Sequence, residues 1–260
     1  MKARITARLK RLALVACLLV LVGSTAACGS GSSSSSSETT LHVLAASSLT
    51  EVFDNLASTF EKDHPGVKVV PVYDSSATLA TQVQQGAPAD VLATADTVTM
   101  KTVLDSGDVD HTDVFATNHM VLVTPTANPA HIHSFADLDN HGVSYVVCVP
   151  SAPCGAIAAA LLKRNHITAK PKSLEVDVKS VLTKVTSGEA DAGLVYASDA
   201  NAAGGDVSVL SVPGSQALRN SYPIGVVKQS DHPGLAQQWI DLVRSSTGQG
   251  VLQDAGFGAP

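Results

Sequence analysis

Four stretches of this sequence place small or hydroxyl-bearing residues where an apolar, strand-like run passes into a helical pattern. They are Ser47-Ser48, Ser75-Ser76, residues 152–155 (Ala-Pro-Cys-Gly) and Asp177-Val178. The first turn of a helix presents backbone N–H groups that have no partner in the helix, and the helix dipole adds about half a positive charge there. Serine hydroxyls add further donors. Helix starts that face a common point would therefore bind an anion without any Lys or Arg.

Each of these junctions also has a simpler explanation. Ser and Asp are frequent helix caps, worth about 1 kcal/mol each. Ser48-Leu49-Thr50-Glu51 has the spacing of a capping box, in which Ser48 and Glu51 would bond to the backbone of their own helix. The anion-site hypothesis thus depends on whether the fold brings the four junctions together.

Strand-like and helical patterns alternate through the region after residue 38. We expect strands at 41–45, 67–73, 91–94, 143–149 and 192–196, and helices after the first four of them, at 177–188 and from 235 onward. This alternation predicts an α/β fold with largely parallel sheets, which bind ligands at the carboxyl ends of their strands. The apolar runs 120–124 and 224–227 are candidates for strands that cross between two lobes.

The N-terminal segment has the pattern of an export signal. Five basic residues at positions 2–11 precede an uncharged apolar stretch at 12–22, which is short for a membrane-spanning helix. Thr25-Ala26-Ala27-Cys28 is similar to the cleavage site of bacterial lipoproteins, and residues 29–37 are all Ser or Gly. We expect a lipoprotein signal peptide at 1–27 and a lipidated Cys28 with its tether at 28–38. Ordinary cleavage after Ala27 and a retained membrane helix are the alternatives.

The charge of the chain argues against one class of partner, and its composition indicates the class of protein. Removal of residues 1–27 takes away five positive charges and no negative ones, so the formal net charge changes from −6 to −11. An acidic chain without a basic face is not expected to bind nucleic acid. The hydrophobic content of 45% and charged content of 15% indicate a globular protein.

Two cysteines belong to the exported domain, Cys148 and Cys154. Six positions apart in an exported protein, they are candidates for a disulfide, and two reduced thiols are the alternative. Neighbouring residues offer no third or fourth ligand, which argues against zinc. The nine histidines are scattered, and only His131 and His133 lie close in sequence. We expect no metal site other than one for an oxyanion.

Motifs of catalysis are absent from the sequence. It has no G-x-S-x-G nucleophile elbow and no paired carboxylates in an acid/base frame. We therefore expect a binding protein rather than an enzyme, and no resident cofactor.

From residue 41 to residue 260 the chain resembles the molybdate-binding proteins that serve ABC importers. The resemblance rests on these stretches: 45–50 (Ala-Ala-Ser-Ser-Leu-Thr), 75–80 (Ser-Ser-Ala-Thr-Leu-Ala), 86–91 (Gly-Ala-Pro-Ala-Asp-Val) followed by Ala95-Asp96, 193–200 (Gly-Leu-Val-Tyr-Ala-Ser-Asp-Ala) and 222–224 (Tyr-Pro-Ile). It implies a two-lobed, type II periplasmic-binding-protein (Venus-flytrap) fold, with two mixed, mainly parallel sheets joined by crossing hinge strands. Lobe 1 would comprise 39–119 and 225–260, and lobe 2 would comprise 120–224.

The same resemblance implies the binding residues. Ser48 and Ser76 would donate through hydroxyl and backbone groups from the first lobe. Cys154 and Val178 would donate backbone N–H groups from the second lobe, and Tyr196 would donate its phenol. All five are neutral donors, so the ligand itself would supply the charge.

Ligand, partners and location also follow from the resemblance. It implies molybdate as the ligand, with tungstate close enough in size to bind as well. The protein would be a monomer, held by a lipid anchor at the outer face of the cytoplasmic membrane, and would serve a transmembrane permease and its ATPase. Another tetrahedral oxyanion, sulfate or phosphate, is the alternative ligand. Asp74, beside the second serine pair, favours phosphate within that alternative because a carboxylate would accept its proton.

Overall fold

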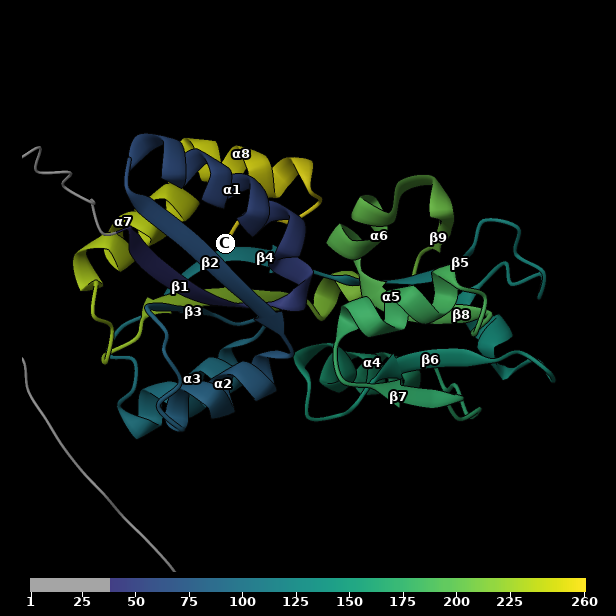
Figure 1. The fold of residues 1–260 in the computed structure, drawn as a ribbon. Helices are drawn as coiled ribbons and strands as arrows, with labels where there is room; N and C mark the ends of the chain where they lie inside the picture. Colours follow the sequence, from purple (N-terminus) through teal and green to yellow (C-terminus); the bar gives the residue numbers. More distant parts are fainter. Residues whose placement is uncertain (1–37) are drawn as a thin grey trace, which may run out of the picture. The chain divides into compact units, whose positions relative to one another are not determined.

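The structure is a computed structural model that describes residues 38–260. These residues form two five-stranded mixed sheets with helices packed against them (Figure 1). The predicted signal peptide, the predicted lipidation site Cys28 and residues 29–37 of the tether lie outside the described residues. Within residues 38–260, no helix combines the length and apolar character needed to cross a membrane.

The first sheet has the strand order β2-β1-β3-β10-β4. Its strands are β1 (Thr39–Ala46), β2 (Val67–Asp74), β3 (Val91–Ala93), β4 (Asp113–Asn118) and β10 (Asn220–Val226). Strand β1 pairs in parallel with β2 and β3, whereas β10 is antiparallel to β3 and β4. The alternation of strand and helix therefore produces parallel pairing in this sheet except at β10, which arrives from the second half of the chain.

Helices cover both faces of the first sheet (Figure 1). On one face lie α1 (Thr50–Asp63), α7 (Pro233–Arg244) and α8 (Ser246–Asp254), and on the other lie α2 (Ser76–Gln84) and α3 (Thr97–Ser106). The rings of Phe53 and Phe60 meet Trp239 edge-on, with centroids 5.4 and 5.6 Å apart. This aromatic cluster joins α1 to α7 within the buried core of the first face.

The second sheet has the order β7-β6-β8-β5-β9. Its strands are β5 (Met120–Pro125), β6 (Tyr145–Cys148), β7 (Ser173–Glu175), β8 (Ala192–Tyr196) and β9 (Val207–Leu210). Its helices are α4 (Pro153–Arg164), α5 (Val178–Thr186) and α6 (Ala197–Ala203). Short 3₁₀ turns lie at η1 (Ser47–Leu49), η2 (Phe135–Asp139), η3 (Gly204–Asp206) and η4 (Ser215–Ala217). This sheet and its helices enclose a hydrophobic core of their own.

The predicted strands are all present, and apart from the one expected at 224–227 their ends differ by no more than two residues. The structure adds β4, β7, β9 and α6, which are short or lack a clear period. Strand β10 begins at Asn220 rather than near 224, so residues 220–224 pair with β4 and β3 of the first sheet. The remaining limits of the two lobes stay predictions.

The predicted capping box at the start of α1 is wrong. The helix begins at Thr50, with Leu49 as its N-cap and without a side-chain cap. The 3₁₀ turn η1 precedes the helix and places Ser48 inside that turn, away from the capping position. The Ser48 hydroxyl instead lies 3.0 Å from the Tyr222 hydroxyl, and Glu51 bonds to Lys179. Both side chains are thereby used in contacts between distant parts of the chain.

Gly155 provides a test of how tightly the start of α4 packs. A Cβ added at Gly155 would overlap the backbone carbonyl of Val149, whereas one at Gly250, in α8, would meet nothing within 4 Å. We expect Gly155→Ala to lower the free energy of unfolding by about 3 kcal/mol. Gly250→Ala should leave it unchanged or raise it by up to about 1 kcal/mol, because alanine favours helices. Urea unfolding of both variants measures the difference, and equal stabilities would contradict the close packing.

Candidate functional site

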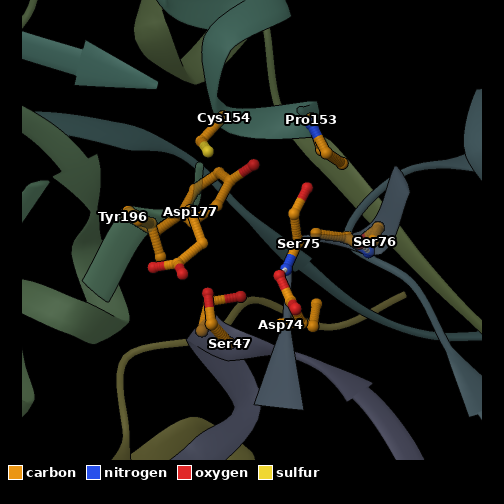
Figure 2. Close-up of a pocket in the computed structure, with 12 residues that line it drawn as sticks. Ser47, Asp74, Ser75, Ser76, Pro153, Cys154, Asp177 and Tyr196 are labelled. Atoms are coloured by element: carbon orange, nitrogen blue, oxygen red, sulfur yellow. Dashed lines mark hydrogen bonds between the residues drawn. The ribbon is translucent and has the colours of Figure 1, made fainter. Parts of the chain in front are cut away.

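One pocket is lined by the helix starts of both sheets. It is lined by all five predicted binding residues, Ser48, Ser76, Cys154, Val178 and Tyr196. Figure 2 shows Pro153 and Cys154 on one side of it and Ser47 and Asp74 on the opposite side. The fold thus brings together residues that are up to about 150 positions apart in the sequence.

Each of the helix starts follows a strand directly. Strand β1 runs into η1 and α1, β2 into α2, β6 into α4 and β7 into α5. The carboxyl ends of parallel strands lie at one edge of a sheet, so the helices that follow begin at that edge. This connection explains why the four junctions that the sequence singled out meet in space.

The backbone supplies hydrogen-bond donors at these starts. Pro153 begins α4 and has no N–H, so Cys154 carries the first donor of that helix. In α5 the carboxylate of the N-cap Asp177 accepts the Ser180 N–H at 2.8 Å, while Val178 occupies the first helical position. Groups in the first turn have no carbonyl partner within their own helix. The N–H groups of Cys154 and Val178 are therefore available to a ligand in the pocket.

Three hydroxyls of the lining add to these donors. Ser48, Ser76 and Tyr196 are all almost fully buried, at 3%, 1% and 1% exposed. Burial, with smaller contributions from neighbouring Tyr222 and Asp199, raises the pKa of Tyr196 well above its usual range. The phenol therefore keeps its hydrogen at physiological pH and can act as a donor.

The charged residues of the lining are acidic. Asp74 and Asp177 line the pocket, and no Lys, Arg or His is part of the described lining. Both carboxylates have backbone partners: Asp74 accepts the Ser75 N–H at 2.6 Å, and Asp177 caps α5. The pocket can thus hold an anion only through neutral donors, in the presence of two acidic groups that are bonded to the first turns of helices.

A group of three charged residues connects the two sheets beside the pocket. Lys179 Nζ of α5 lies 2.6 and 2.8 Å from the two carboxylate oxygens of Glu51 in α1. It also lies 3.3 Å from Asp199 Oδ1 in α6, and the Asp199 side chain is 0% exposed. Burial raises the pKa of Asp199 to about 6 although Lys179 acts in the opposite direction. The pair of Lys179 and Glu51 links α5 to α1.

Cys148 and Cys154 form a disulfide in the structure, with Cα atoms 5.8 Å apart. The bond ties the end of β6 to the first turn of α4, where Cys154 lines the pocket. Both cysteines are buried. Residues 38–260 contain no cluster of three or more His, Cys, Asp or Glu placed to hold a metal ion.

Comparison with known proteins identifies the family. Residues 41–258 match the family described as bacterial extracellular solute-binding protein. The chain belongs to this family. The family consists of solute-binding proteins rather than enzymes, and the pocket of this solute-binding protein lies where its two lobes meet.

Two relatives and one solved structure are similar to this chain over most of its length. The molybdate-binding protein ModA of Mycobacterium tuberculosis is 40% identical over 243 residues, covering 93% of each chain. YvgL of Bacillus subtilis, provisionally named an ABC transporter substrate-binding lipoprotein, is 33% identical and covers 95% of this chain and 96% of its own. The periplasmic molybdate-binding protein of Azotobacter vinelandii has the same two-lobed fold, with a TM-score of 0.76, 21% identity and coverage of 85% of this chain and 99% of its own.

Several residues near the pocket were not predicted as functional. Ser47, Ser75 and Asp177 belong to junctions that the sequence singled out, and they also line it. Asn220 and Tyr222 bond to lining hydroxyls from β10, and Lys179 joins the sheets. Tyr222 belongs to the stretch 222–224 on which the family resemblance rests, whereas Asn220 reaches the site only through the pairing of distant strands, which leaves no local sequence signal.

Asp199 makes the stability of the protein depend on pH, with a sign that follows from its raised pKa. Between its ordinary pKa of 3.8 and its folded pKa of about 6, the folded state binds more protons than the unfolded chain. The contribution of Asp199 to the free energy of unfolding therefore falls as the pH rises through this window, by about 3 kcal/mol in all. Urea unfolding should show the stability of wild type relative to Asp199→Asn falling from about pH 4 to pH 6 and constant outside it. A difference that does not vary with pH would refute the raised pKa.

Proposed function

We propose that this protein captures molybdate in the pocket between its two lobes and delivers it to an ABC permease. The observation that carries the proposal is the convergence of four helix starts and three buried hydroxyls on one pocket without a cationic side chain in its described lining. An oxyanion that carries two negative charges and no proton is an acceptor only, and this set of groups suits such a ligand. The 40% identity to the M. tuberculosis molybdate-binding protein supports the choice of anion.

In the proposed complex, donors come from both lobes. Ser48 and Ser76 donate through hydroxyl and backbone N–H groups, Cys154 and Val178 through backbone N–H groups, and Tyr196 through its phenol. Hydrogen bonds to a charged acceptor contribute about 1.5–3 kcal/mol each, so seven donors contribute roughly 10–20 kcal/mol before the cost of association is subtracted. Since micromolar affinity corresponds to about 8 kcal/mol, we expect binding at or below the micromolar range.

Tungstate is included in the proposal because it has the same charge and shape as molybdate. Closure of the two lobes around the ligand would present a distinct surface to a transmembrane permease and its ATPase. Lys179 and Glu51 would support that closed form, since their ion pair joins α5 and α1.

A second candidate ligand follows from Asp74 and Asp177. A carboxylate in the lining could accept the proton of a monoprotonated oxyanion such as hydrogen phosphate, whereas it repels a dianion without a proton. The hydrogen bond from the Ser75 N–H to Asp74 engages one of its oxygens and moderates this repulsion. Sulfate, which has no proton at neutral pH, competes with molybdate through size alone.

Calorimetric titration at pH 7.5 distinguishes these ligands. We expect residues 38–260 to bind molybdate and tungstate with micromolar or tighter dissociation constants, and sulfate and phosphate at least about 100-fold more weakly. The measurement is a separate titration with each anion at matched ionic strength. Tight phosphate binding would transfer the function to the second candidate and give Asp74 the role of proton acceptor, and tight sulfate binding would contradict the predicted selection by size.

We also propose that a lipid on Cys28 anchors the protein at the outer face of the cytoplasmic membrane. The lipoprotein-like site at 25–28 and the Ser/Gly tether support this location, as does the relative YvgL. Cys28→Ala should release the protein from the membrane pellet into the soluble fraction, whereas Cys17→Ala, inside the predicted signal, should not.

Cells that carry each variant, or no copy of the protein, provide the readouts. We expect molybdenum accumulation at scarce external molybdate to be highest with wild type and lowest without the protein. Cys28→Ala protein that stays in the membrane pellet would favour a retained N-terminal helix as the anchor. Equal accumulation with and without the protein would contradict delivery to a permease.

A further inference from the structure

The pocket hydroxyls are already bonded within the protein. The Oγ atom of Ser76 accepts the backbone N–H of Ala95 at 2.9 Å, and the Oη atom of Tyr196 accepts the side-chain amide N–H of Asn220 at 2.6 Å. An N–H group can only donate, so in both cases the hydroxyl oxygen serves as the acceptor. The hydrogen of each hydroxyl is therefore left for another partner.

The orientation of the Asn220 side chain is determined by a second contact. Its Nδ2 atom lies 2.5 Å from the backbone carbonyl oxygen of Ala95, as well as 2.6 Å from Tyr196 Oη. A carbonyl oxygen only accepts, and a reversed amide would place two oxygens at this short separation. The amino end of Asn220 must therefore face both atoms, and Tyr196 has to accept from it.

Asn220 lies where the two lobes meet. It begins β10 of the first sheet, whereas Tyr196 ends β8 of the second. The Asn220 side chain is buried, and within the described part of the chain its Oδ1 atom has no hydrogen-bond partner. A buried amide oxygen without a partner lowers stability, and an apolar residue would avoid that cost. The amino end of Asn220, which holds Tyr196, gives this buried amide a role.

Tyr222 is the other hydroxyl near Tyr196. The two rings meet edge-on with centroids 6.0 Å apart, and the Tyr222 hydroxyl lies 3.0 Å from Ser48 Oγ. Tyr222 is thus engaged with the first serine of the site, whereas Tyr196 itself lines the pocket. The Tyr196 hydrogen, which cannot face Asn220, is directed either at Tyr222 or at the pocket, and a charged oxyanion is the stronger acceptor of the two.

We propose that Asn220 is a positioning residue that presets the Tyr196 hydroxyl as a hydrogen-bond donor to the bound oxyanion. The inference rests on the proposed function, because only an acceptor ligand benefits from this preset. A hydroxyl that presents a lone pair to an oxyanion repels it, so a free rotor would have to reorient on binding. Asn220 reduces that reorganisation by excluding the orientation toward itself, and preorganised donors bind more tightly than mobile ones.

A double-mutant cycle measured by calorimetry with molybdate tests the inference. The exported full-length protein is compared with Tyr196→Phe, Asn220→Leu and the double variant. We expect Tyr196→Phe to weaken binding by about 10- to 100-fold. Asn220→Leu should weaken it about three- to tenfold when Tyr196 is present and by less than about twofold when Phe replaces it. A residue that acts through the Tyr196 hydroxyl loses its effect when that hydroxyl is absent.

Asn118 supplies a matched control. It is a buried asparagine directly opposite Asn220 in β4, and its amide bonds to Ser198 at 2.9 Å and to Tyr222, neither of which lines the binding pocket. Asn118→Leu should change molybdate affinity by the same factor whether it is made in the wild-type protein or in the Tyr196→Phe variant. Thermal unfolding without ligand identifies any variant that does not fold, and Asn220→Ala is then used in place of Asn220→Leu.

The outcomes separate this inference from the proposed function. Wild-type protein that does not bind molybdate would refute the function itself. Wild-type binding with an equal loss from Asn220→Leu in both backgrounds would assign Asn220 a structural role and overturn the inference. Unchanged affinity in the Asn220 variants would overturn it as well.

Discussion

The pocket depends on one constraint, which is that the first N–H groups of a helix have no carbonyl partner within it. Four helix starts line one pocket in this protein, from η1 and α2 beside the first sheet and from α4 and α5 beside the second. Parallel pairing places them there, because each start follows the carboxyl end of a strand. An anion in the pocket would accept hydrogen bonds from these N–H groups, so it would supply the partners that the helices themselves cannot.

Apart from the edge-on rings of Tyr196 and Tyr222, the contacts described between the lobes are polar, which would suit a pocket that opens. Within the described residues, the buried hydrophobic clusters of the two sheets are separate. The sheets are instead joined by hydrogen bonds and an ion pair: Asn220 to Tyr196, Asn118 to Ser198, and Lys179 to Glu51. Polar groups can exchange such partners for water when the lobes part, whereas an apolar interface would hold them together. Each core would remain intact during that motion.

Features that depend on neighbouring residues could be predicted from the sequence, whereas features that depend on contacts between distant parts of the chain could not. The strand–helix junctions are local, and periodicity together with Ser and Asp placement predicted them, whereas the binding role of Tyr196 was implied by the family resemblance alone. The Ser48–Glu51 capping box failed because tertiary contacts outweighed a local preference: Ser48 lies 3.0 Å from the Tyr222 hydroxyl and Glu51 bonds to Lys179. The role proposed for Asn220 could not be predicted, since it depends on β10 returning to the first sheet.

Because the donors are neutral and the protein is acidic, its affinity for an anion has to come from short-range hydrogen bonds in the pocket. At physiological ionic strength charges are screened beyond about 8 Å, so the net charge of the chain has little effect on an ion inside the pocket. A Lys or Arg in the lining would attract any anion, whereas fixed N–H and O–H groups favour a ligand whose oxygens match their positions. Asp74 and Asp177 add to this selectivity because their carboxylates repel an anion, and only an anion that makes the full set of hydrogen bonds offsets that repulsion. The hydroxyls of Ser76 and Tyr196, whose oxygens accept from Ala95 and Asn220, would then matter more to binding than any long-range field.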